Sequence, residues 1–329
     1  MAPVPADSLE RLGQTWALDA PTERKRMLII VNPYATTVSE RLKNLVVYAL
    51  QGRYEVTAVE TKARNHATEL CREARAEGYD VVVAFGGDGT VNEAANGLAG
   101  GDVPLTCLPG GATNVYAKML GIPGEIVDAT EHLLRMADDW RPRRADLARV
   151  NGRHFVFSSG IGLDASVVER VDRHPYRKAK FGAAYFTWAA ITTFLGRYVT
   201  RPPRLEVELA DGTRLAGVTA IVQNGDPFTY FRNRPIHIAD GGAIDDGQLR
   251  GVVLKRSTPT VMPTILWRAF SRNAKMTRAR AIDGFEGTEE LTIRSTDGRP
   301  IPLQVDGDHI GDVTEAVYGI APRALPVVS

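Results

Sequence analysis

A strand-like run that breaks into glycine constrains the fold of this chain most. Residues Tyr79–Phe85 read YDVVVAF, a β-branched and unbroken run that is typical of a strand buried in a parallel sheet. Gly86 and Gly87 follow, and Thr90–Leu98 has the pattern of a helix. Glycine lets a ligand approach the main chain, and a helix N-terminus presents N–H groups to an anion. The sequence therefore predicts one strand–turn–helix unit suited to a phosphate-bearing ligand.

Further strands and helices alternate around this unit. Strands are predicted over Met27–Val31, Tyr54–Val59, Val81–Phe85 and Pro104–Leu108, and helices over Ser39–Leu50, Asn65–Glu77 and Thr113–Leu120. Such alternation predicts a doubly wound α/β domain with a parallel sheet. We expect a flexible arm over 1–24 and the α/β domain over 25–147, with completion by 318–329 left open.

The pattern changes after Asp146, where short apolar runs are separated by Asp-Gly turn signals. The runs are Val150–Ser159, Arg204–Leu209, Gly217–Asn224, Ile236–Ala239, Gln248–Leu254, Phe285–Ile293 and Pro302–Val305. They predict a second, mainly antiparallel β domain over 148–317. Two helical inserts are expected in it, at Phe181–Leu195 and Pro259–Ala274.

Composition narrows the function classes. The 329 residues are 44% hydrophobic, enough for two domains that each have a core. With 40 basic and 39 acidic residues the net charge is +1, so no global field recruits nucleic acid. The two cysteines, Cys71 and Cys107, lie in apolar patterns and favour a reducing compartment. Met1–Ala20 lacks the features of a secretory signal, and no apolar run approaches the ~18 residues of a membrane span. We expect a cytoplasmic protein.

Five motifs occur in a fixed order along the chain. They are Asn32-Pro33 after the first strand, GGDGTVNE over Gly86–Glu93, LPGGATN over Leu108–Asn114, IDDG over Ile244–Gly247 and VDGD over Val305–Asp308. In this order they resemble the diacylglycerol kinase catalytic-domain family, which also contains sphingosine and ceramide kinases and bacterial soluble lipid kinases. The matches cover roughly residues 27 to 320, and five ordered motifs are far more specific than one glycine cluster.

The resemblance implies an enzyme that binds ATP and Mg²⁺ and transfers the γ-phosphoryl group to a lipid hydroxyl, with diacylglycerol as the preferred acceptor. Asp88 would be repelled by the phosphates unless a cation or a water network intervened, and we expect Mg²⁺ there. The implied cofactor-binding residues are Asn32, Pro33, Tyr34, Ala35, Thr36, Thr61, Gly86, Gly87, Asp88, Gly89, Thr90, Val91, Asn92, Glu93, Gly111, Ala112, Thr113 and Asn114.

The chemistry is expected at the VDGD motif. The transfer requires removal of the hydroxyl proton, and the resemblance points to Asp306 and Asp308 for the base and its support. We favour Asp308 as the proton acceptor. Asp246 resembles a structural Mg²⁺ ligand of the bacterial members, together with the carbonyls of Ala243 and Gln248, with a solvated turn as the alternative.

Three features depart from the family pattern. Ala112 stands where the family has threonine, and Thr113 follows one residue later. Tyr34–Thr37 replaces the usual Ser-Gly after Asn-Pro. Asp308 replaces a glutamate, which shortens the reach of the carboxylate by one methylene.

The residues that would contact lipid, and the choice among rival functions, stay open. The apolar insert Phe181–Leu195 is a buried helix, a wall of an acyl-chain pocket or an interfacial element. Basic clusters near Arg173–Lys180 and Arg268–Arg280 suit peripheral contact with an anionic membrane at the inner face, or a solvated cationic surface. The alternatives are a sphingoid-base or other lipid kinase, an NAD kinase-like enzyme and a non-catalytic nucleotide-binding regulator. Whether the chain forms a homodimer is left open.

Overall fold

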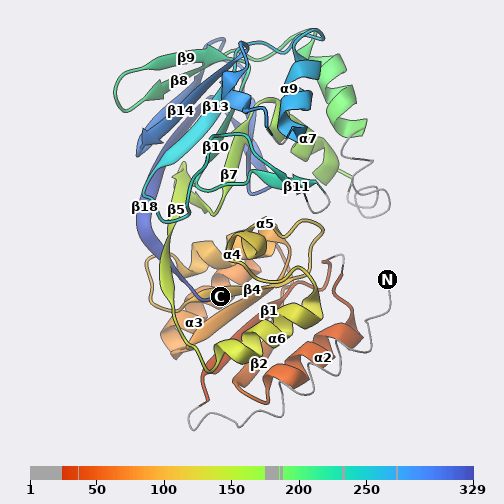
Figure 1. Ribbon diagram of the computed structural model, residues 1–329, viewed down its shortest axis with the longest axis vertical. Coiled ribbons are helices and arrows are strands. Elements are labelled where there is room, and N and C mark those ends of the chain that lie inside the picture. The colour runs from red at the N-terminus through yellow and green to blue at the C-terminus, as the bar shows by residue number, and fades with distance from the viewer. Residues whose placement is uncertain (1–23, 36, 175–184, 186–187, 232–233, 272) are drawn as a thin grey trace. The chain divides into compact units, whose positions relative to one another are not determined.

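The chain divides into two compact units in the computed structural model, which describes residues 24–329 except 36, 175–184, 186–187, 232–233 and 272 (Figure 1). One unit extends to Ala145 and takes in Arg323–Ser329, and the other is Asp146–Pro322. The arm expected over 1–24 lies outside the described residues apart from Arg24.

The first unit is built on a parallel sheet. Its strands are β1 (Arg26–Val31), β2 (Glu55–Glu60), β3 (Val81–Gly86) and β4 (Leu105–Pro109). They lie in the order β2-β1-β3-β4, and every neighbouring pair is parallel. The end of β18 (Glu315–Val327) joins this sheet, with Val327 opposite Leu105. β3 is buried at every position, which is why its sequence is an unbroken apolar run.

The helices of this unit follow from the strand order. They are α2 (Glu40–Leu50), α3 (His66–Glu77), α4 (Asp88–Leu98), α5 (Val115–Met119) and α6 (Ile126–Met136). Because β3 lies on the other side of β1 from β2, the chain reverses direction there, and right-handed crossovers place α2 on one face and α3 and α4 on the other. α3 packs on α4 and α2 packs on α6 (Figure 1). The reversal makes the C-terminal edge between β1 and β3 the switch point, where open α/β sheets bind ligands.

The second unit is a sandwich of two antiparallel sheets. One has the order β14-β13-β10-β7-β16-β17. The other runs from the start of β18 through β15 and β8 to β9, and β5 pairs with both β18 and β6. The bounds are β5 (Arg143–Val150), β6 (Arg153–Phe155), β7 (Ser158–Ile161), β8 (Leu205–Leu209), β9 (Arg214–Gly217), β10 (Thr219–Gln223), β13 (Leu249–Leu254), β14 (Ile282–Thr288), β15 (Glu290–Ser295), β16 (Ile301–Val305) and β17 (Asp308–Val313). β11 (Thr229–Phe231) and β12 (Arg234–Ile236) form a separate ribbon.

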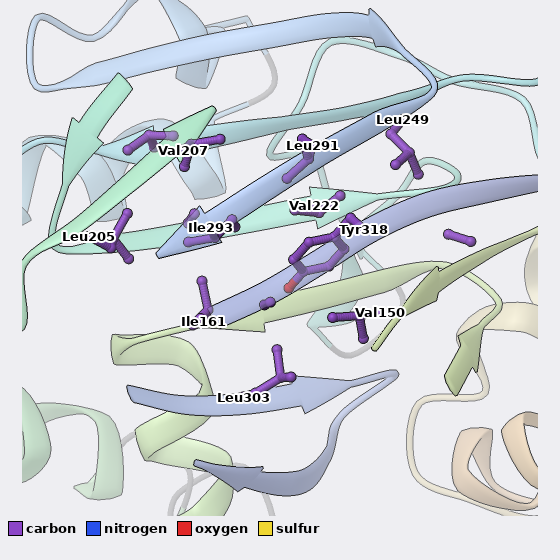
Figure 2. Packing of buried hydrophobic residues seen from close by; sticks show 14 of the residues in the cluster. Val150, Ile161, Leu205, Val207, Val222, Leu249, Leu291, Ile293, Leu303 and Tyr318 are labelled. Carbon is purple, nitrogen blue, oxygen red and sulfur yellow. The ribbon is translucent and has the colours of Figure 1, made fainter. Parts of the chain in front are cut away.

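Inward-facing side chains of both sheets form the core of the sandwich. Val207 and Ile293 come from one sheet, and Ile161, Val222 and Leu303 come from the other (Figure 2). All five are buried, as expected where two sheets pack face to face.

Helical segments interrupt the second unit. They are α7 (Leu163–Asp172), a helical stretch at 188–193 that continues into a π-helical turn at Phe194–Tyr198, α9 (Met262–Phe270) and a 3₁₀ turn at Met276–Arg278. Among the described residues, no helix combines the length and the apolarity needed to cross a bilayer.

The predicted fold class is confirmed, but several elements differ from the expectation. The run Val150–Ser159 is not one strand: β5 and β6 form a hairpin there, turning at Asn151 and Gly152 in left-handed conformations, and β7 follows. Phe285–Ile293 contains parts of two strands in different sheets, β14 and β15. α6 and α7 were not predicted, and α9 is shorter than the predicted insert. Of the predicted helix Phe181–Leu195, the structure describes 185 and 188–195, which are helical, and the other residues lie outside the described ones.

Candidate active site

Three loops converge at the C-terminal ends of β1, β3 and β4. The Gly110 N–H donates to the carbonyl of Gly86 at 2.8 Å. A Cβ on Gly111 would lie 2.7 Å from the Cα of Gly87, and a Cβ on Gly86 would collide with the hydroxyl of Thr90. Glycine is required at these positions because two stretches of main chain touch. The result is a cradle of bare main chain at the switch point of the sheet.

Asn32 ties the first loop to the second. Its N–H donates to the carbonyl of Phe85 at 2.9 Å, and its Nδ2 donates to the Thr90 hydroxyl at 3.2 Å. Its Oδ1 accepts from the N–H of Tyr34 at 3.0 Å, and its carbonyl accepts from the N–H of Ala35 at 3.1 Å. This asparagine therefore sets the conformation of the loop that follows β1.

The rest of the first loop is more open. The side chain of Tyr34 is 87% exposed, and Pro33 and Ala35 are partly buried. Thr37 anchors the end of the loop, since its N–H donates to the carbonyl of Gly110 at 3.2 Å. Thr36, predicted to contact the nucleotide, lies outside the described residues.

The N-terminus of α4 opens directly from the second loop. Gly87 is the N-cap and supplies no side chain to cap the helix, and Asp88 and Gly89 are its first two residues. Oδ1 of Asp88 accepts from the N–H of Tyr116 at 3.1 Å, which holds the carboxylate beside α5. Burial lowers the pKa of Lys118, and the charge of nearby Asp88 opposes that shift. The loop thus combines helix-terminal amides with one carboxylate and one ammonium group.

This arrangement fits a nucleotide phosphate accompanied by Mg²⁺. Gly87 and Gly111 are so close that a Cβ on Gly111 would collide with the Cα of Gly87, and an uncapped helix N-terminus favours an anion. A carboxylate such as that of Asp88 is the ligand type by which proteins hold Mg²⁺ together with substrate phosphates. The first unit alone therefore carries the groups that a phosphate site needs.

Asn114 closes the third loop. Its Oδ1 accepts from the N–H of Gly111 at 2.9 Å, and its Nδ2 donates to the carbonyl of the same residue at 2.8 Å. Asn114 adopts φ 50°, a left-handed conformation that asparagine tolerates better than most residues. Ala112 is exposed and Thr113 is partly buried. The loop therefore closes through Asn114 and does not depend on a hydroxyl at position 112.

Glu93 does not face the cradle. Its two carboxylate oxygens accept from the N–H groups of Asn65 at 2.8 Å and Ala67 at 3.2 Å, at the start of α3. Its carbonyl accepts from the Thr68 hydroxyl at 2.8 Å. These contacts satisfy amide groups that the first turn of a helix leaves without partners. These hydrogen bonds give Glu93 a structural role that does not depend on a nucleotide.

Three further predicted residues lie within the framework around the cradle. Thr61 continues the pairing of β1 and β2, since its N–H donates to the carbonyl of Val31 at 2.8 Å. Val91 and Asn92 are buried in α4, and the main-chain carbonyl of Asn92 accepts from Nδ2 of Asn96 at 2.8 Å. Of the predicted residues that the structure describes, Asn32–Ala35, Gly86–Thr90 and Gly111–Asn114 lie on or next to the three converging loops, and their contact with a nucleotide stays a prediction.

The two candidate bases occupy one hairpin of the second unit but differ in setting. Asp306 and Gly307, both at positive φ, form the turn between β16 and β17. The Asp306 carboxylate is buried and accepts three main-chain N–H groups, from Val156 at 2.8 Å, Phe157 at 3.0 Å and Ser158 at 3.1 Å. It thereby joins this hairpin to the segment before β7.

Asp308 is the first residue of β17 and lies opposite Val305 in the hairpin. It is partly exposed, whereas Asp306 is 4% exposed. A general base must reach the proton that it removes. The setting of Asp308 suits that requirement better, because the carboxylate of Asp306 already accepts three main-chain hydrogen bonds.

Asp164, at the start of α7, is a candidate that the sequence reasoning missed. Its Oδ2 accepts from Nε2 of Gln304 at 2.7 Å, and Oε1 of Gln304 accepts from the N–H of Gly307 at 2.9 Å. Burial raises the pKa of Asp164 to about 6, and the hydrogen bond from Gln304 opposes that rise. A signal was present, because Gly160 and Gly162 precede Asp164 between a strand and a helix, as Gly86 and Gly87 precede Asp88.

The predicted metal position at Asp246 is filled by other groups. Its carboxylate accepts from the N–H groups of Ala243 at 3.1 Å and Gln248 at 3.2 Å. Nη1 of Arg250, a residue that is 8% exposed, lies 2.8 Å from Oδ2. The arrangement does not fit a divalent cation at this carboxylate, because the guanidinium already supplies the positive charge.

Residues 26–150 match the diacylglycerol kinase catalytic domain, and residues 157–329 match the YegS C-terminal NAD kinase beta sandwich-like domain. This chain belongs to the diacylglycerol kinase catalytic-domain family. The resemblance drawn from the five motifs is thereby confirmed. Membership in this family of lipid kinases follows from both halves of the chain.

Individual relatives agree with this assignment. A diacylglycerol kinase of Bacillus subtilis (strain 168) is 37% identical over 147 residues, which is 42% of this chain and 46% of that protein. A putative lipid kinase of Streptococcus pneumoniae serotype 4 is 26% identical over 91% of this chain and 96% of its own length. The crystal structure of a putative diacylglycerol kinase from Bacillus anthracis str. Sterne superposes with a TM-score of 0.73 at 24% identity, covering 94% of this chain and 97% of that chain. The last comparison establishes the shared fold.

Proposed function

We propose that this lipid kinase family member transfers the γ-phosphoryl group of ATP to diacylglycerol and produces phosphatidic acid. The observation that carries the proposal is the contact of Gly87 with Gly111 beside the uncapped N-terminus of α4. A cradle of main chain at a switch point is a site for phosphate groups. The relatives that carry the name diacylglycerol kinase support the choice of acceptor.

In this proposal, main-chain N–H groups at the start of α4 bind phosphate oxygens, and the Asn32–Thr90 hydrogen bond keeps the first two loops in register. Asp88 holds the cation, and Lys118 balances charge near that carboxylate. When bound, the magnesium salt of ATP supplies the phosphoryl group and neutralises the charge that develops during transfer.

Asp308 accepts the proton of the acceptor hydroxyl in this proposal. Asp306 supports it by fixing the hairpin through the three N–H groups of Val156, Phe157 and Ser158. Asp164 contributes through Gln304, whose amide side chain bridges the Asp164 carboxylate and the N–H of the turn.

The test is incorporation of labelled phosphate from ATP into diacylglycerol, sphingosine and NAD, each presented separately with Mg²⁺. We expect label in diacylglycerol, and a loss of at least ~100-fold in Asp308→Ala with unchanged ATP binding by calorimetry. Asp211→Ala is the matched control, because Asp211, like Asp308, is an aspartate next to the glycine of a hairpin turn in the second unit.

Each other outcome selects a rival. Label in sphingosine alone indicates a sphingoid-base kinase, and label in NAD alone indicates an NAD kinase-like enzyme, the activity named in the sandwich-domain match. ATP binding without transfer to any acceptor favours a regulator. Absence of ATP binding in the presence of Mg²⁺ would refute the nucleotide site itself.

A further inference from the structure

One face of α9 is apolar and exposed. Val261, Met262, Ile265 and Ala269 pack against the buried cluster beneath the helix. On the other side, Leu266 is 54% exposed, Trp267 63% and Phe270 42%. Exposed large apolar side chains are ordinary when scattered singly, but three within five residues form a patch that marks an interaction site.

A second helical segment of the same unit adds to this surface. Within 188–199, Trp188, Ile191, Leu195 and Val199 are all at least 38% exposed, and their spacing places them on one face of a helix. The hydroxyl of Ser257, shortly before α9, donates to the carbonyl of Tyr198 at 2.9 Å. The two elements therefore meet, and they lie side by side in Figure 1. We call these seven residues the apolar surface.

The two sequence segments that carry the apolar surface are basic. Residues 173–205 contain seven basic and no acidic residues, and residues 247–282 contain eight basic and no acidic residues. Subtracting these 15 positive charges from the net charge of +1 leaves −14 on the rest of the chain. A chain that is nearly neutral as a whole has thus concentrated its positive charge in the two segments that carry the apolar surface.

Several of these basic side chains are exposed beside α9. Arg256, Arg278 and Arg280 are exposed, as is Lys275, which lies 3.5 Å from Asp240. Acidic groups from neighbouring elements neutralise only part of the charge. Besides Asp240, these are Asp246 beside Arg250, Asp283 beside Lys255, and Glu169 beside Arg173 and Arg197.

We propose that the apolar surface and its basic border dock on an anionic lipid bilayer. Bilayer interfaces take up tryptophan and aliphatic side chains at the depth of the headgroups, while arginine and lysine bind anionic lipids. A soluble polyanion would use the charge and leave the apolar surface without a partner. The inference deepens the proposed function, because a diacylglycerol acceptor resides in a bilayer, but docking itself requires no catalysis.

The test is sedimentation of the full-length protein with vesicles, in the absence of ATP and diacylglycerol. Vesicles of equal parts phosphatidylglycerol and phosphatidylcholine are compared with vesicles of phosphatidylcholine alone. We expect binding to the anionic vesicles to be at least ~10-fold tighter, and to weaken as salt rises.

Two double variants locate the surface. Arg278→Gln with Arg280→Gln should weaken binding by about 25-fold, at about 5-fold for each charge. Leu266→Ser with Trp267→Ser should weaken it at least ~10-fold. The matched controls are Arg72→Gln with Arg143→Gln, and Leu45→Ser with Tyr48→Ser, which alter exposed residues of the same types in the first unit. Circular dichroism checks that all variants fold.

Equal binding to neutral and anionic vesicles, no binding to either, or variants that bind like their controls would overturn the proposal. So would a dimer in size-exclusion chromatography that Leu266→Ser with Trp267→Ser converts to monomer, because a second copy would then cover the surface. Phosphorylation of short-chain diacylglycerol in detergent micelles is measured in parallel. Vesicle binding without turnover refutes the kinase alone, and turnover without vesicle binding refutes the docking alone.

Discussion

Replacing Asp306 by alanine removes the acceptor of three buried main-chain N–H groups. These groups belong to Val156, Phe157 and Ser158, at 2.8, 3.0 and 3.1 Å from the carboxylate oxygens. Alanine also has to adopt φ near 48°, a left-handed conformation that glycine, asparagine and aspartate tolerate better than alanine does. The substitution should therefore damage the fold of the second unit before it affects any reaction.

The magnitude follows from these contacts. A hydrogen bond to a charged group contributes about 1.5–3 kcal/mol, so three would nominally contribute about 5–9 kcal/mol. Bonds that share one acceptor are not additive, and water can reach some of the released amides, so we expect about 4 kcal/mol. Asp306→Asn should lose about 2 kcal/mol, because its oxygen can still accept from Phe157 and Ser158 while its amide nitrogen faces the Val156 N–H.

The assay is urea unfolding, combined with hydrogen exchange of peptides that cover 153–161. Asp306→Ala should lower the unfolding free energy by about 4 kcal/mol and accelerate exchange at 156–158, whereas Asp211→Ala, which loses one exposed turn hydrogen bond, should change it by less than about 1 kcal/mol. An Asp306→Ala protein within about 1 kcal/mol of wild type would refute the reasoning. An Asp306→Asn protein that is stable but inactive would make Asp306 the base in place of Asp308.

Three further outcomes are expected. Because burial raises the pKa of Asp164 to about 6, the folded state binds more protons than the unfolded state between about pH 4 and 6. As the pH rises through that window, the unfolding free energy of wild type should therefore fall by about 2–3 kcal/mol relative to that of Asp164→Asn. Curves of unfolding free energy against pH that run parallel for the two proteins would contradict this. Gly111→Ala should weaken ATP binding at least ~10-fold in calorimetry, because its Cβ meets main chain 2.7 Å away, and Gly124→Ala, which meets nothing within 4 Å, should bind normally. Without nucleotide, EDTA should leave the Tm of wild type unchanged, because Arg250 already neutralises Asp246. The substitution Arg250→Gln should itself lower the Tm, because it leaves the charge of Asp246 without its partner. A fall in the wild-type Tm on chelation would show that a metal is present.

The Asp-Gly turns show where the local sequence pattern was enough to predict the role of an aspartate and where it was not. The Asp-Gly pairs at 211, 246 and 306 look alike in the sequence. In the structure, Asp211 lies in an exposed hairpin turn and Asp246 forms an ion pair with Arg250. Asp306 is buried, and its carboxylate accepts three main-chain N–H groups. The three partners of the Asp306 carboxylate lie 148 to 150 positions away in the sequence, which no local pattern contains.

The sequence alone determined the parallel strands, the glycine loops and the two-part fold, because strand burial, helix periodicity and the glycine requirement act over a few neighbouring residues. Only the tertiary structure decided which acidic groups serve the fold. It turned Glu93 toward α3, joined Asp164 to the Asp306 hairpin through Gln304, and gathered the apolar surface from two separate inserts. Those assignments depend on which distant groups meet when the sheets pack, and on the burial that then sets the energy of each charge.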